Sequence, residues 1–387
     1  MTAVKENIKI AHTAFSVSSS SGGIGPVIKG VTSALSKLNG IETKTYVPEN
    51  GVVEDFDTPI DTFKCLGAPH HCFNNGLPKQ ISDQKFDILH CHGIWSFLAR
   101  TNHRWKASGK PYVISPHGMT MPAAMKFSRW KKILFWPLLE KTNLRKAAFL
   151  HALSSIEAAS IRALGIKTPI VQIGNGVDLP ELAVHQETNA ETNGGVRTIL
   201  YLGRLHPIKG LDKMIGAWRS AKVNSPGKDN WRLQIVGWGQ EDYVQKLKDQ
   251  SQGDESILFS GPLFGDDKHR AMHQASAFIL PSSSEAFPMA LMEAWSHGLP
   301  AVATTTCNVL GDAGNSVSLF VGDTEEDIVS GIQKIVGLSD QERQTMGDAA
   351  RAIVATDYSW QKIAQNFVTS YQWALGVGQK PSELMYD

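Results

Sequence analysis

Two glutamates, Glu285 and Glu293, flank the start of a short helical pattern. Pro288 suits the first turn of that helix, and Gly298 followed by Pro300 marks its end. The apolar residues between these signals predict a buried helix, in which a carboxylate needs a hydrogen-bond or ionic partner. Carboxylates accept hydrogen bonds from hydroxyl groups, and the N-terminus of a helix attracts an anion. The segment therefore suits a ligand with both hydroxyl and phosphate groups, such as a nucleotide-sugar.

Two cations flank a glycine-bearing turn after the strand predicted at residues 198–202, namely Arg204 and Lys209. Arginine forms forked hydrogen bonds with phosphate oxygens and lysine acts as a point charge, so this pair is suited to a diphosphate. In the alternative interpretation, the two cations and the two glutamates have structural roles. The cations would then be solvated, and the glutamates would meet lysine or arginine partners around a capped core helix.

Glycine-bearing turns follow several predicted strands, where the backbone can approach a ligand closely. Gly22, Gly23 and Gly25 stand between a strand at residues 8–17 and a helix at 27–38. Gly203, Gly237 and the GPLFG segment that contains Leu263 follow later strands. We expect these turns to line a nucleotide site, with ordinary tight turns as the alternative.

Histidines end two predicted strands of the first half of the chain. His90 and His92 share one face at the end of the strand that begins at Phe86, and His117 follows the strand at 111–116. Ligands bind at this edge in open α/β sheets. At least one of these histidines is expected to be functional, the alternative being satisfied core or turn residues.

Two other patterns resemble metal ligands, namely Asp55 with Asp57 and the run His70-His71-Cys72. The aspartates stand in a polar stretch between Pro48 and Gln84 that reads as loop, and the run has no further ligands at a zinc-like spacing. We therefore expect no metal site.

The stretch from Lys126 to Lys146 has seven basic residues and one acidic residue, interleaved with aromatic ones. It predicts basic amphipathic helices. Such a surface could lie on anionic lipid or meet a lipid-linked or anionic acceptor. The alternative is a solvated helical face whose aromatic side chains pack inward.

The length of 387 residues predicts two domains, and alternating strands and helices predict an α/β class. The expected divisions are a first domain at 1–178, a linker at 179–196, a second domain at 197–357 and a final helix at 358–387. Ser154 and Glu157 form a capping-box pattern for a structural helix, 156–164.

The net charge of +1 gives no global reason to expect nucleic-acid binding. The four cysteines form no CxxC pair, which favours a reduced, cytoplasmic protein. We find no secretory signal pattern and no apolar run of membrane-spanning length.

The ordered motifs GGIG, HCHG, SPHG, GNGVD, GRLHPIKG, VGWG and EAFPMALMEAWSHGLPAVAT resemble glycosyltransferase family 4 over nearly the whole chain. Members of that family have the GT-B fold, an α/β architecture of two facing Rossmann-like domains with an interdomain cleft. By this resemblance, residues 1–178 would be the acceptor domain and 197–357 the donor domain, and the final helix at 358–387 would return to the first domain. The resemblance implies a retaining, metal-independent glycosyltransferase that needs no cofactor and moves a hexosyl unit from a nucleoside-diphosphate sugar to a glycan or lipid-linked acceptor. A role in exopolysaccharide or lipopolysaccharide assembly, at the inner face of the membrane, is the family-level expectation.

The resemblance also implies roles for individual residues. Arg204 and Lys209 would contact the diphosphate, Glu293 the ribose and Glu285 the donor sugar. Backbone groups of Phe287, Pro288 and Met289 would reach other sugar hydroxyls, although Pro288 lacks an N–H. His117 matches the family's active-site histidine, His92 would lie on the acceptor side, and the loop of Gly22, Gly23 and Gly25 would close over the phosphates.

Two rival functions remain open from the sequence. A sugar-nucleotide epimerase shares the two-domain architecture, and a non-catalytic nucleotide-sugar-binding protein would keep the donor site without turnover. An oxidoreductase fits less well, because no GxGxxG with a downstream acidic residue is present.

Overall fold

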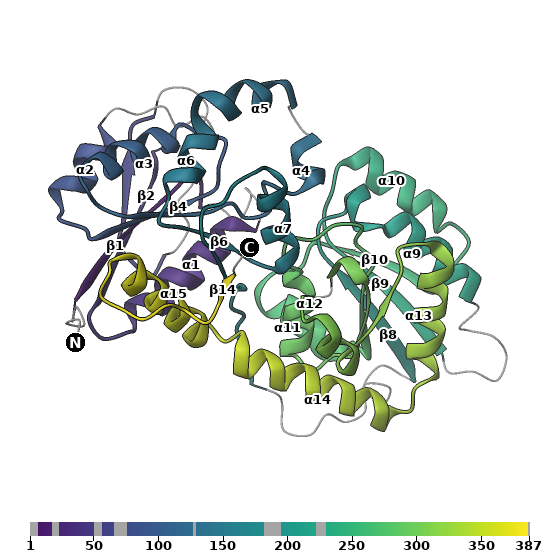
Figure 1. The fold of residues 1–387 in the computed structure, drawn as a ribbon. Helices are drawn as coiled ribbons and strands as arrows, with labels where there is room; N and C mark the ends of the chain where they lie inside the picture. The colour runs from purple at the N-terminus through teal and green to yellow at the C-terminus, as the bar shows by residue number, and fades with distance from the viewer. Residues whose placement is uncertain are drawn as a thin grey trace. The chain divides into compact units, whose positions relative to one another are not determined.

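The computed structural model describes residues 7–17, 23–49, 56–65, 76–126, 129–181, 195–221, 230–307 and 309–385. The chain forms two compact α/β units (Figure 1), of which unit 1 comprises residues 1–176 and 360–387 and unit 2 comprises residues 177–359. Gly22, Asp55, the run His70-His71-Cys72 and most of the predicted linker lie outside the described residues.

Unit 1 is built on an eight-stranded sheet in the order β14-β7-β6-β5-β4-β1-β2-β3. All neighbours are parallel except β14, which is antiparallel to β7. Its strands are β1 (Ile8–Ala14), β2 (Ile41–Pro48), β3 (Ile60–Phe63), β4 (Ile88–His92), β5 (Tyr112–Ser115), β6 (Phe149–Ala152), β7 (Ile170–Gln172) and β14 (Leu384–Met385). Its helices are α1 (Ile24–Ser36), α2 (Leu77–Asp83), α3 (Leu98–Ala107), α4 (Pro122–Lys126), α5 (Arg129–Phe135), the π-helix η2 (Trp136–Glu140), α6 (Lys141–Lys146), α7 (Ser155–Ala163) and α15 (Trp360–Ala374).

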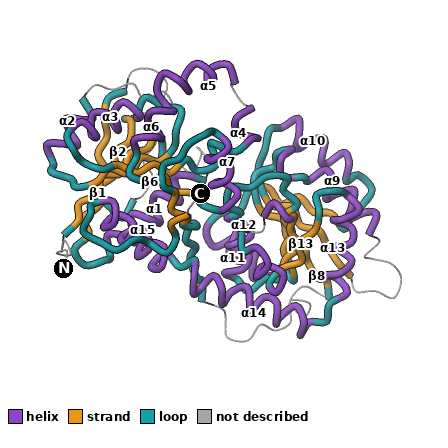
Figure 2. Tube along the Cα trace, in the orientation of Figure 1, coloured by secondary structure: helices purple, strands orange, loops and turns teal. Residues whose placement is uncertain are grey.

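Both faces of this sheet are buried, as expected for a parallel sheet. Side chains alternate along β5, so Tyr112 and Ile114 join the core under α2, α3 and α6, while Val113 joins the core under α1 and α15. Figures 1 and 2 show these two helical layers with the strands between them.

The last helix completes unit 1 although the whole of unit 2 precedes it in the chain. Phe367 and Tyr371 of α15 are 2% and 0% exposed and belong to the same core as α1. The indole of Trp360 fills the space that side chains at Gly30 and Gly176 would need, since a Cβ at these two positions would lie 2.2 Å and 2.4 Å from its ring atoms. The two glycines thus permit the chain to close this core.

Unit 2 has a six-stranded parallel sheet in the order β10-β9-β8-β11-β12-β13. Numbered within the unit, this order is 3-2-1-4-5-6, the order of a Rossmann fold. Its strands are β8 (Val196–Leu202), β9 (Asn230–Val236), β10 (Ile257–Gly261), β11 (Ala277–Leu280), β12 (Ala301–Thr304) and β13 (Ser318–Val321). Its helices are α9 (Leu211–Ala221), α10 (Glu241–Gln250), α11 (Gly265–Gln274), α12 (Met289–Ser296), α13 (Glu325–Gly337), α14 (Asp340–Asp357) and the 3-10 helices η3 (Pro207–Lys209), η4 (Thr305–Cys307) and η5 (Gly311–Ser316).

Helices cover both faces of the unit 2 sheet, with α9, α10 and α13 on one side and α11, α12 and α14 on the other (Figure 1). Trp295 of α12 is fully buried, and its indole N–H donates to Ser318 Oγ at 2.9 Å. The helix predicted after Pro288 is confirmed as α12, and Gly298 after it adopts a positive φ of 71°.

The expectation of loop throughout residues 48–84 is wrong. The stretch contains the edge strand β3 and the short helix α2, which begins with Pro78 in its first turn. Both elements are short, and β3 buries Phe63 alone, so neither leaves a strong periodic pattern.

Candidate functional site

The carboxyl end of the unit 2 sheet brings one predicted cation, Lys209, against one predicted carboxylate, Glu285. The strand order reverses between β8 and β11, so the loops that follow these two strands diverge on opposite sides of a crevice, where nucleotides bind in such folds. The first loop carries Arg204 and Lys209, and the second carries Glu285. Lys209 Nζ lies 2.5 Å from Glu285 Oε1, although 76 residues separate them in sequence.

A close backbone approach fixes this ion pair. Gly210 has a φ of 68°, and a Cβ there would lie 2.2 Å from the carbonyl oxygen of Pro281. The N–H of Ser283 donates to the carbonyl of Ile208 at 2.9 Å, which joins the same two loops. The two side chains of the pair keep 21% and 11% exposure, so a ligand can reach both charges.

Arg204 is exposed, and its guanidinium forms no hydrogen bond with the residues that the structure describes. Its backbone carbonyl accepts a hydrogen bond from the Tyr201 hydroxyl at 3.0 Å. This contact positions the backbone and leaves the side chain available to a ligand. Gly237 lies against this loop, because a Cβ there would be 1.8 Å from the carbonyl oxygen of Gly203. Contact between the two loops is therefore one reason for glycine at 237.

Glu293 lies one turn into α12 and meets Lys268 of α11, whose Nζ is 3.2 Å from its Oε1. Their side chains are 28% and 26% exposed. Lys268 was missed by the sequence analysis, because no local pattern signals a contact between α11 and α12. Leu263 is partly buried in the loop before α11.

The turn before α12 is held by its own backbone and by packing. Phe287 is 7% exposed and its ring centroid lies 5.8 Å from that of Tyr358. Met289 N–H donates to the carbonyl of Phe287 at 3.0 Å, and Pro288 has no N–H to offer. The amide of Met289 would have to leave this contact to bind a ligand hydroxyl.

Unit 1 has an equivalent reversal of strand order between β1 and β4, and histidines gather there. His12 Nδ1 lies 2.9 Å from His92 Nε2, and His92 Nδ1 lies 2.9 Å from His117 Nε2. The structure thus places the predicted His92 and His117 in contact and adds His12, which the sequence analysis missed. The register of β1 with β4, which pairs Ala14 with His92, brings the rings together.

A second chain of hydrogen bonds runs beside the first. His90 Nδ1 contacts the hydroxyl of Tyr371 at 2.7 Å, and His90 Nε2 contacts Ser115 Oγ at 2.6 Å. Ser115 Oγ is 2.6 Å from His151 Nδ1, and His151 Nε2 lies 2.6 Å from the carbonyl oxygen of Ile173. His90 is therefore a core histidine whose two ring nitrogens are both satisfied.

His117 has a positive φ of 52°, an uncommon conformation for a residue with a side chain. Glu157 holds the turn in place, since its Oε1 accepts from Gly118 N–H at 2.5 Å and its Oε2 accepts from Leu153 N–H at 2.8 Å. The predicted capping box is only half formed, because Ser154 Oγ accepts from Glu157 N–H but the Glu157 carboxylate turns toward Gly118. Glu157 is thus a support of the His117 turn that the sequence analysis treated as a cap.

Burial keeps this histidine cluster neutral. Burial lowers the pKa of His12 and of His117 to about 3, and that of His151 to about 4. The pKa values of His90 and His92 are also well below the usual range, because burial and the neighbouring imidazoles oppose a positive charge.

His12, His90 and His92 could each offer a nitrogen to a metal ion, with ligand atoms within 4.8 Å of one another. Both nitrogens of His90 and of His92 already form hydrogen bonds, however. A metal ion would have to replace several of these contacts, so the residues fit a hydrogen-bonded cluster better than a metal centre.

The basic stretch forms three consecutive helical segments, α5, η2 and α6. Pro137, the second residue of η2, lacks an N–H, and Lys141 N–H bonds to the carbonyl of Trp136 across the wide turn. Large apolar side chains of this surface are exposed, among them Trp130 at 70% and Leu138 at 73%. The alternative, in which the aromatic side chains pack inward, therefore does not hold for Trp130.

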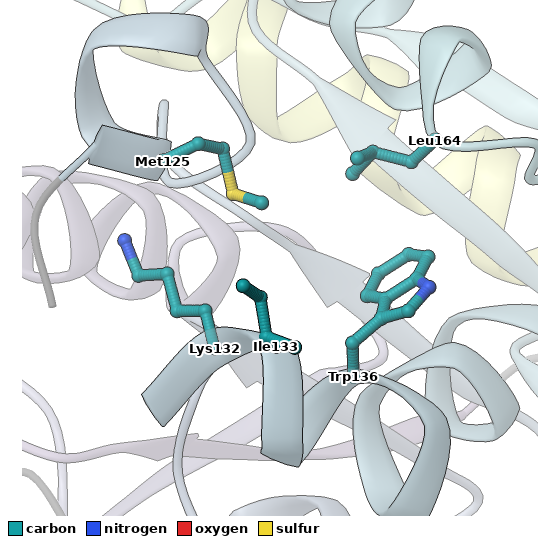
Figure 3. Close-up of a pocket in the computed structure, with 5 residues that line it drawn as sticks. All are labelled: Met125, Lys132, Ile133, Trp136 and Leu164. Atoms are coloured by element: carbon teal, nitrogen blue, oxygen red, sulfur yellow. The ribbon is translucent and has the colours of Figure 1, made fainter. Parts of the chain in front are cut away.

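A pocket of about 280 Å³ opens beside these helices (Figure 3). It is lined by Met125, Lys132, Ile133, Trp136 and Leu164. The ammonium group of Lys132 donates to the carbonyl of Ala124 at 2.5 Å and lies 5.5 Å from the ring centroid of Trp95. Within the described part of the chain, no helix combines the length and apolar character that crossing a bilayer requires.

The two sheets define a GT-B glycosyltransferase fold of two Rossmann-like domains. The family model described as Glycosyltransferase Family 4 matches residues 21–181, and that described as Glycosyl transferases group 1 matches residues 186–353. The chain belongs to this family of glycosyltransferases, as its motifs predicted.

Two curated relatives are similar in sequence. GDP-mannose:cellobiosyl-diphosphopolyprenol alpha-mannosyltransferase of Xanthomonas oryzae pv. oryzae is 27% identical over 302 residues, which are 75% of each chain. Lipopolysaccharide 1,2-N-acetylglucosaminetransferase of Salmonella typhimurium is 26% identical over 201 residues, which are 49% of this chain and 51% of that protein.

Solved structures share the fold. Sucrose-phosphate synthase of Thermosynechococcus elongatus has a TM-score of 0.73 and 17% identity, covering 96% of this chain and all of that one. HepE of Anabaena, solved in complex with UDP and glucose, has a TM-score of 0.70 and 17% identity, covering 95% and 100% of the two chains.

The neutral histidines predict acid sensitivity of unit 1. Each pKa is lower in the folded state than the value of about 6.5 in the unfolded chain, so the unfolded state binds more protons below pH 6.5 and stability falls as pH falls. His12→Gln removes one such group. The pH slope of the unfolding free energy between pH 6 and pH 4.5 should decrease by about 1.4 kcal/mol per pH unit.

Hydrogen–deuterium exchange of peptides from β4 and β5 measures this free energy for unit 1 alone. Glu140 and Glu157, whose pKa burial raises to about 7, oppose the trend equally in both proteins, so the difference in slope isolates His12. His269→Gln, in unit 2, is the matched control and should leave the slope in unit 1 unchanged. An unchanged slope in His12→Gln would contradict the neutral state of that ring.

Proposed function

We propose that the protein is a retaining glycosyltransferase that moves a hexosyl unit from a nucleoside-diphosphate sugar to a glycan or lipid-linked acceptor in polysaccharide or lipopolysaccharide assembly. The observation that carries this proposal is the ion pair of Lys209 with Glu285 at the strand-order reversal of unit 2, with Arg204 exposed on the same loop as Lys209. The relatives named above act on a diphosphopolyprenol-linked acceptor and on lipopolysaccharide, which supports the acceptor class.

Charge on unit 2 suits the departing diphosphate. Arg204 is exposed and Lys209 keeps access to solvent, so both cations can contact phosphate oxygens. Lys209 would exchange part of its contact with Glu285 for the phosphates, which frees Glu285 to accept a hydrogen bond from a sugar hydroxyl. Glu293, paired with Lys268, would accept from the ribose. Stabilised negative charge on the leaving group is the main requirement of this reaction.

The retaining outcome would follow from attack on the face that the diphosphate leaves. The glycosidic bond weakens first, the departing phosphate oxygen takes the proton of the acceptor hydroxyl, and the new bond forms on the same face. His117, held in a strained backbone conformation, would contact the reacting sugar, with His92 behind it. Gly23 and Gly25, at the start of α1, would approach the phosphates together with Gly22.

Metal independence is part of the proposal. Arg204 and Lys209 would meet the diphosphate charge, and most nitrogens of the unit 1 histidines already form hydrogen bonds with protein groups. No cofactor is needed for the transfer, since the nucleotide-sugar already carries an activated leaving group.

We also propose that the surface formed by α5, η2 and α6 lies on anionic membrane, where a lipid-linked acceptor would be found. Exposed Trp130 and Leu138 would enter the interface, while exposed Arg145 and Lys146 of α6, with exposed Lys126 at the end of α4, would meet lipid phosphates. The apolar pocket behind Ile133 would receive part of a lipid chain (Figure 3).

A transfer assay with EDTA tests the chemistry. Thermal shifts with UDP, GDP and ADP identify the nucleotide first, because a ligand that binds the folded state raises the melting temperature. We expect nucleoside diphosphate to be released rapidly when an acceptor is present, in EDTA, with a product that keeps the anomeric configuration of the donor by NMR. Turnover without acceptor would indicate an epimerase, binding without turnover a non-catalytic protein, and an inverted product would contradict retention.

Substitution tests the diphosphate contacts. Arg204→Ala and Lys209→Ala should each lower kcat/KM by roughly 100-fold, because each removes a charged hydrogen-bond donor from the leaving group. Lys213→Ala is the matched control, since Lys213 is 40% exposed on α9 and contacts Asp323. Circular dichroism should show folded protein in all three. Near-normal turnover in both Arg204→Ala and Lys209→Ala would refute the assignment.

Vesicle binding tests the membrane surface. The double variant Trp130→Ser/Leu138→Ser should lose roughly 10-fold in affinity for phosphatidylglycerol vesicles, since two exposed apolar side chains no longer enter the interface. Leu258→Ser, which changes a 41% exposed leucine of unit 2, is the control and should bind normally. Equal vesicle binding by the double variant would exclude this surface as the contact.

A further inference from the structure

Three imidazole rings form one continuous hydrogen-bonded chain that ends at His117. Its two contacts, His12 Nδ1 to His92 Nε2 and His92 Nδ1 to His117 Nε2, are each 2.9 Å long. Neighbouring rings are stacked with centroids 5.2 Å apart. His12 and His92 are 0% and 1% exposed, so water does not replace either partner.

The geometry restricts where the protons of these rings lie. A neutral imidazole has one N–H donor and one bare nitrogen acceptor, and each contact needs one of each. If His92 carries its proton on Nδ1, it donates to His117, accepts from His12, and leaves all three rings protonated on Nδ1. If His92 carries its proton on Nε2, all three rings are protonated on Nε2. Any mixture would place two donors or two bare nitrogens against each other.

The buried end of the chain separates these two states. His12 Nε2 is buried and has no hydrogen-bond partner among the described residues. In the Nε2–H state this atom would be a buried donor without an acceptor, whereas in the Nδ1–H state it is an unused acceptor. Buried N–H groups without a partner are rarer in proteins than under-used acceptors. The Nδ1–H state is therefore favoured.

We propose that His12 and His92 are positioning residues that hold His117 as its Nδ1–H tautomer. His117 is partly exposed, and its Nδ1 forms no hydrogen bond within the described part of the chain, so this N–H is available to a ligand. In the proposed transferase, on which this step rests, His117 then donates to an oxygen atom of the reacting sugar. It does not stabilise the cationic ring, because an N–H edge carries partial positive charge.

The second histidine chain has the opposite tautomer and serves as an internal reference. The carbonyl of Ile173 can only accept, so His151 must carry its proton on Nε2. Its bare Nδ1 accepts from the Ser115 hydroxyl, which in turn accepts from His90 Nε2–H. His90 and His151 are thus Nε2–H tautomers beside a chain of Nδ1–H tautomers.

Long-range proton–nitrogen NMR on the full chain with ¹⁵N-labelled histidine reads each tautomer directly. Signals are assigned by single substitutions. We expect Nδ1–H for His12, His92 and His117 and Nε2–H for His90 and His151. An Nε2–H or mixed signal for wild-type His117 overturns the proposal.

Two variants test whether the chain acts through His92. In His92→Phe, His117 Nε2 loses its donor, so His117 should become a mixture of tautomers and kcat should fall roughly 10-fold with little change in KM for the donor. His92→Gln, whose amide has one donor and one acceptor end, should restore part of both. Ser115→Ala, which interrupts the neighbouring chain, should leave His117 as Nδ1–H. A mixed His117 in Ser115→Ala, or an unchanged one in His92→Phe, overturns the proposal.

The NMR experiment tests the tautomer chain and the transfer assay tests the proposed transferase, so either proposal can be refuted without the other. If wild-type His117 is Nδ1–H but no donor and acceptor pair turns over, the proposed transferase is wrong and the tautomer chain stands. If transfer occurs with His117 as Nε2–H, the transferase stands and the tautomer chain is wrong.

Discussion

The reversal of strand order in each parallel sheet is the constraint on which both candidate sites depend. A sheet that grows in both directions from its first strand must send neighbouring loops apart at one point, and their backbones leave a crevice there. In unit 2 this point lies between β8 and β11, where Lys209 meets Glu285. In unit 1 it lies between β1 and β4, where His12 meets His92. The same topology thus creates two sites with different chemistry.

The two sites differ in the charge of their side chains. Unit 2 keeps its ion pairs partly exposed, so phosphate and hydroxyl groups can compete for charges that are already arranged. In unit 1, burial lowers the pKa of the histidine rings, so the rings are neutral, and hydrogen bonds join them. Such a cluster has no net charge, but its N–H donors and bare nitrogen acceptors point in fixed directions, because each is determined by its neighbour. One unit is therefore suited to an anion and the other to oriented, uncharged contacts.

Much of the fold was predictable, because β8, β9 and β11 are largely apolar runs that end at glycine or proline. The same rule failed at β3, whose exposed edge position leaves little apolar pattern. For the candidate site, the sequence indicated Lys209 and Glu285 by type, and the strand order explains why they meet. It did not indicate His12, Lys268 or the turn of Glu157 toward Gly118. Those contacts join segments that are distant in sequence, and local spacing contains no information about them.

Unit 1 is discontinuous, and this has a consequence for synthesis of the chain. Ribosomes release residues 177–359 before α15, so unit 2 has all of its sequence while unit 1 still lacks Phe367 and Tyr371. Until then one face of the unit 1 sheet is covered by α1 but not by α15, and His90 has no Tyr371 hydroxyl to contact. Nascent unit 1 therefore exposes apolar surface until α15 has been synthesised, and such surface favours chaperone binding. A chain cut short before α15 would lose the Tyr371 contact of His90, although the missing segment lies far from His90 in sequence.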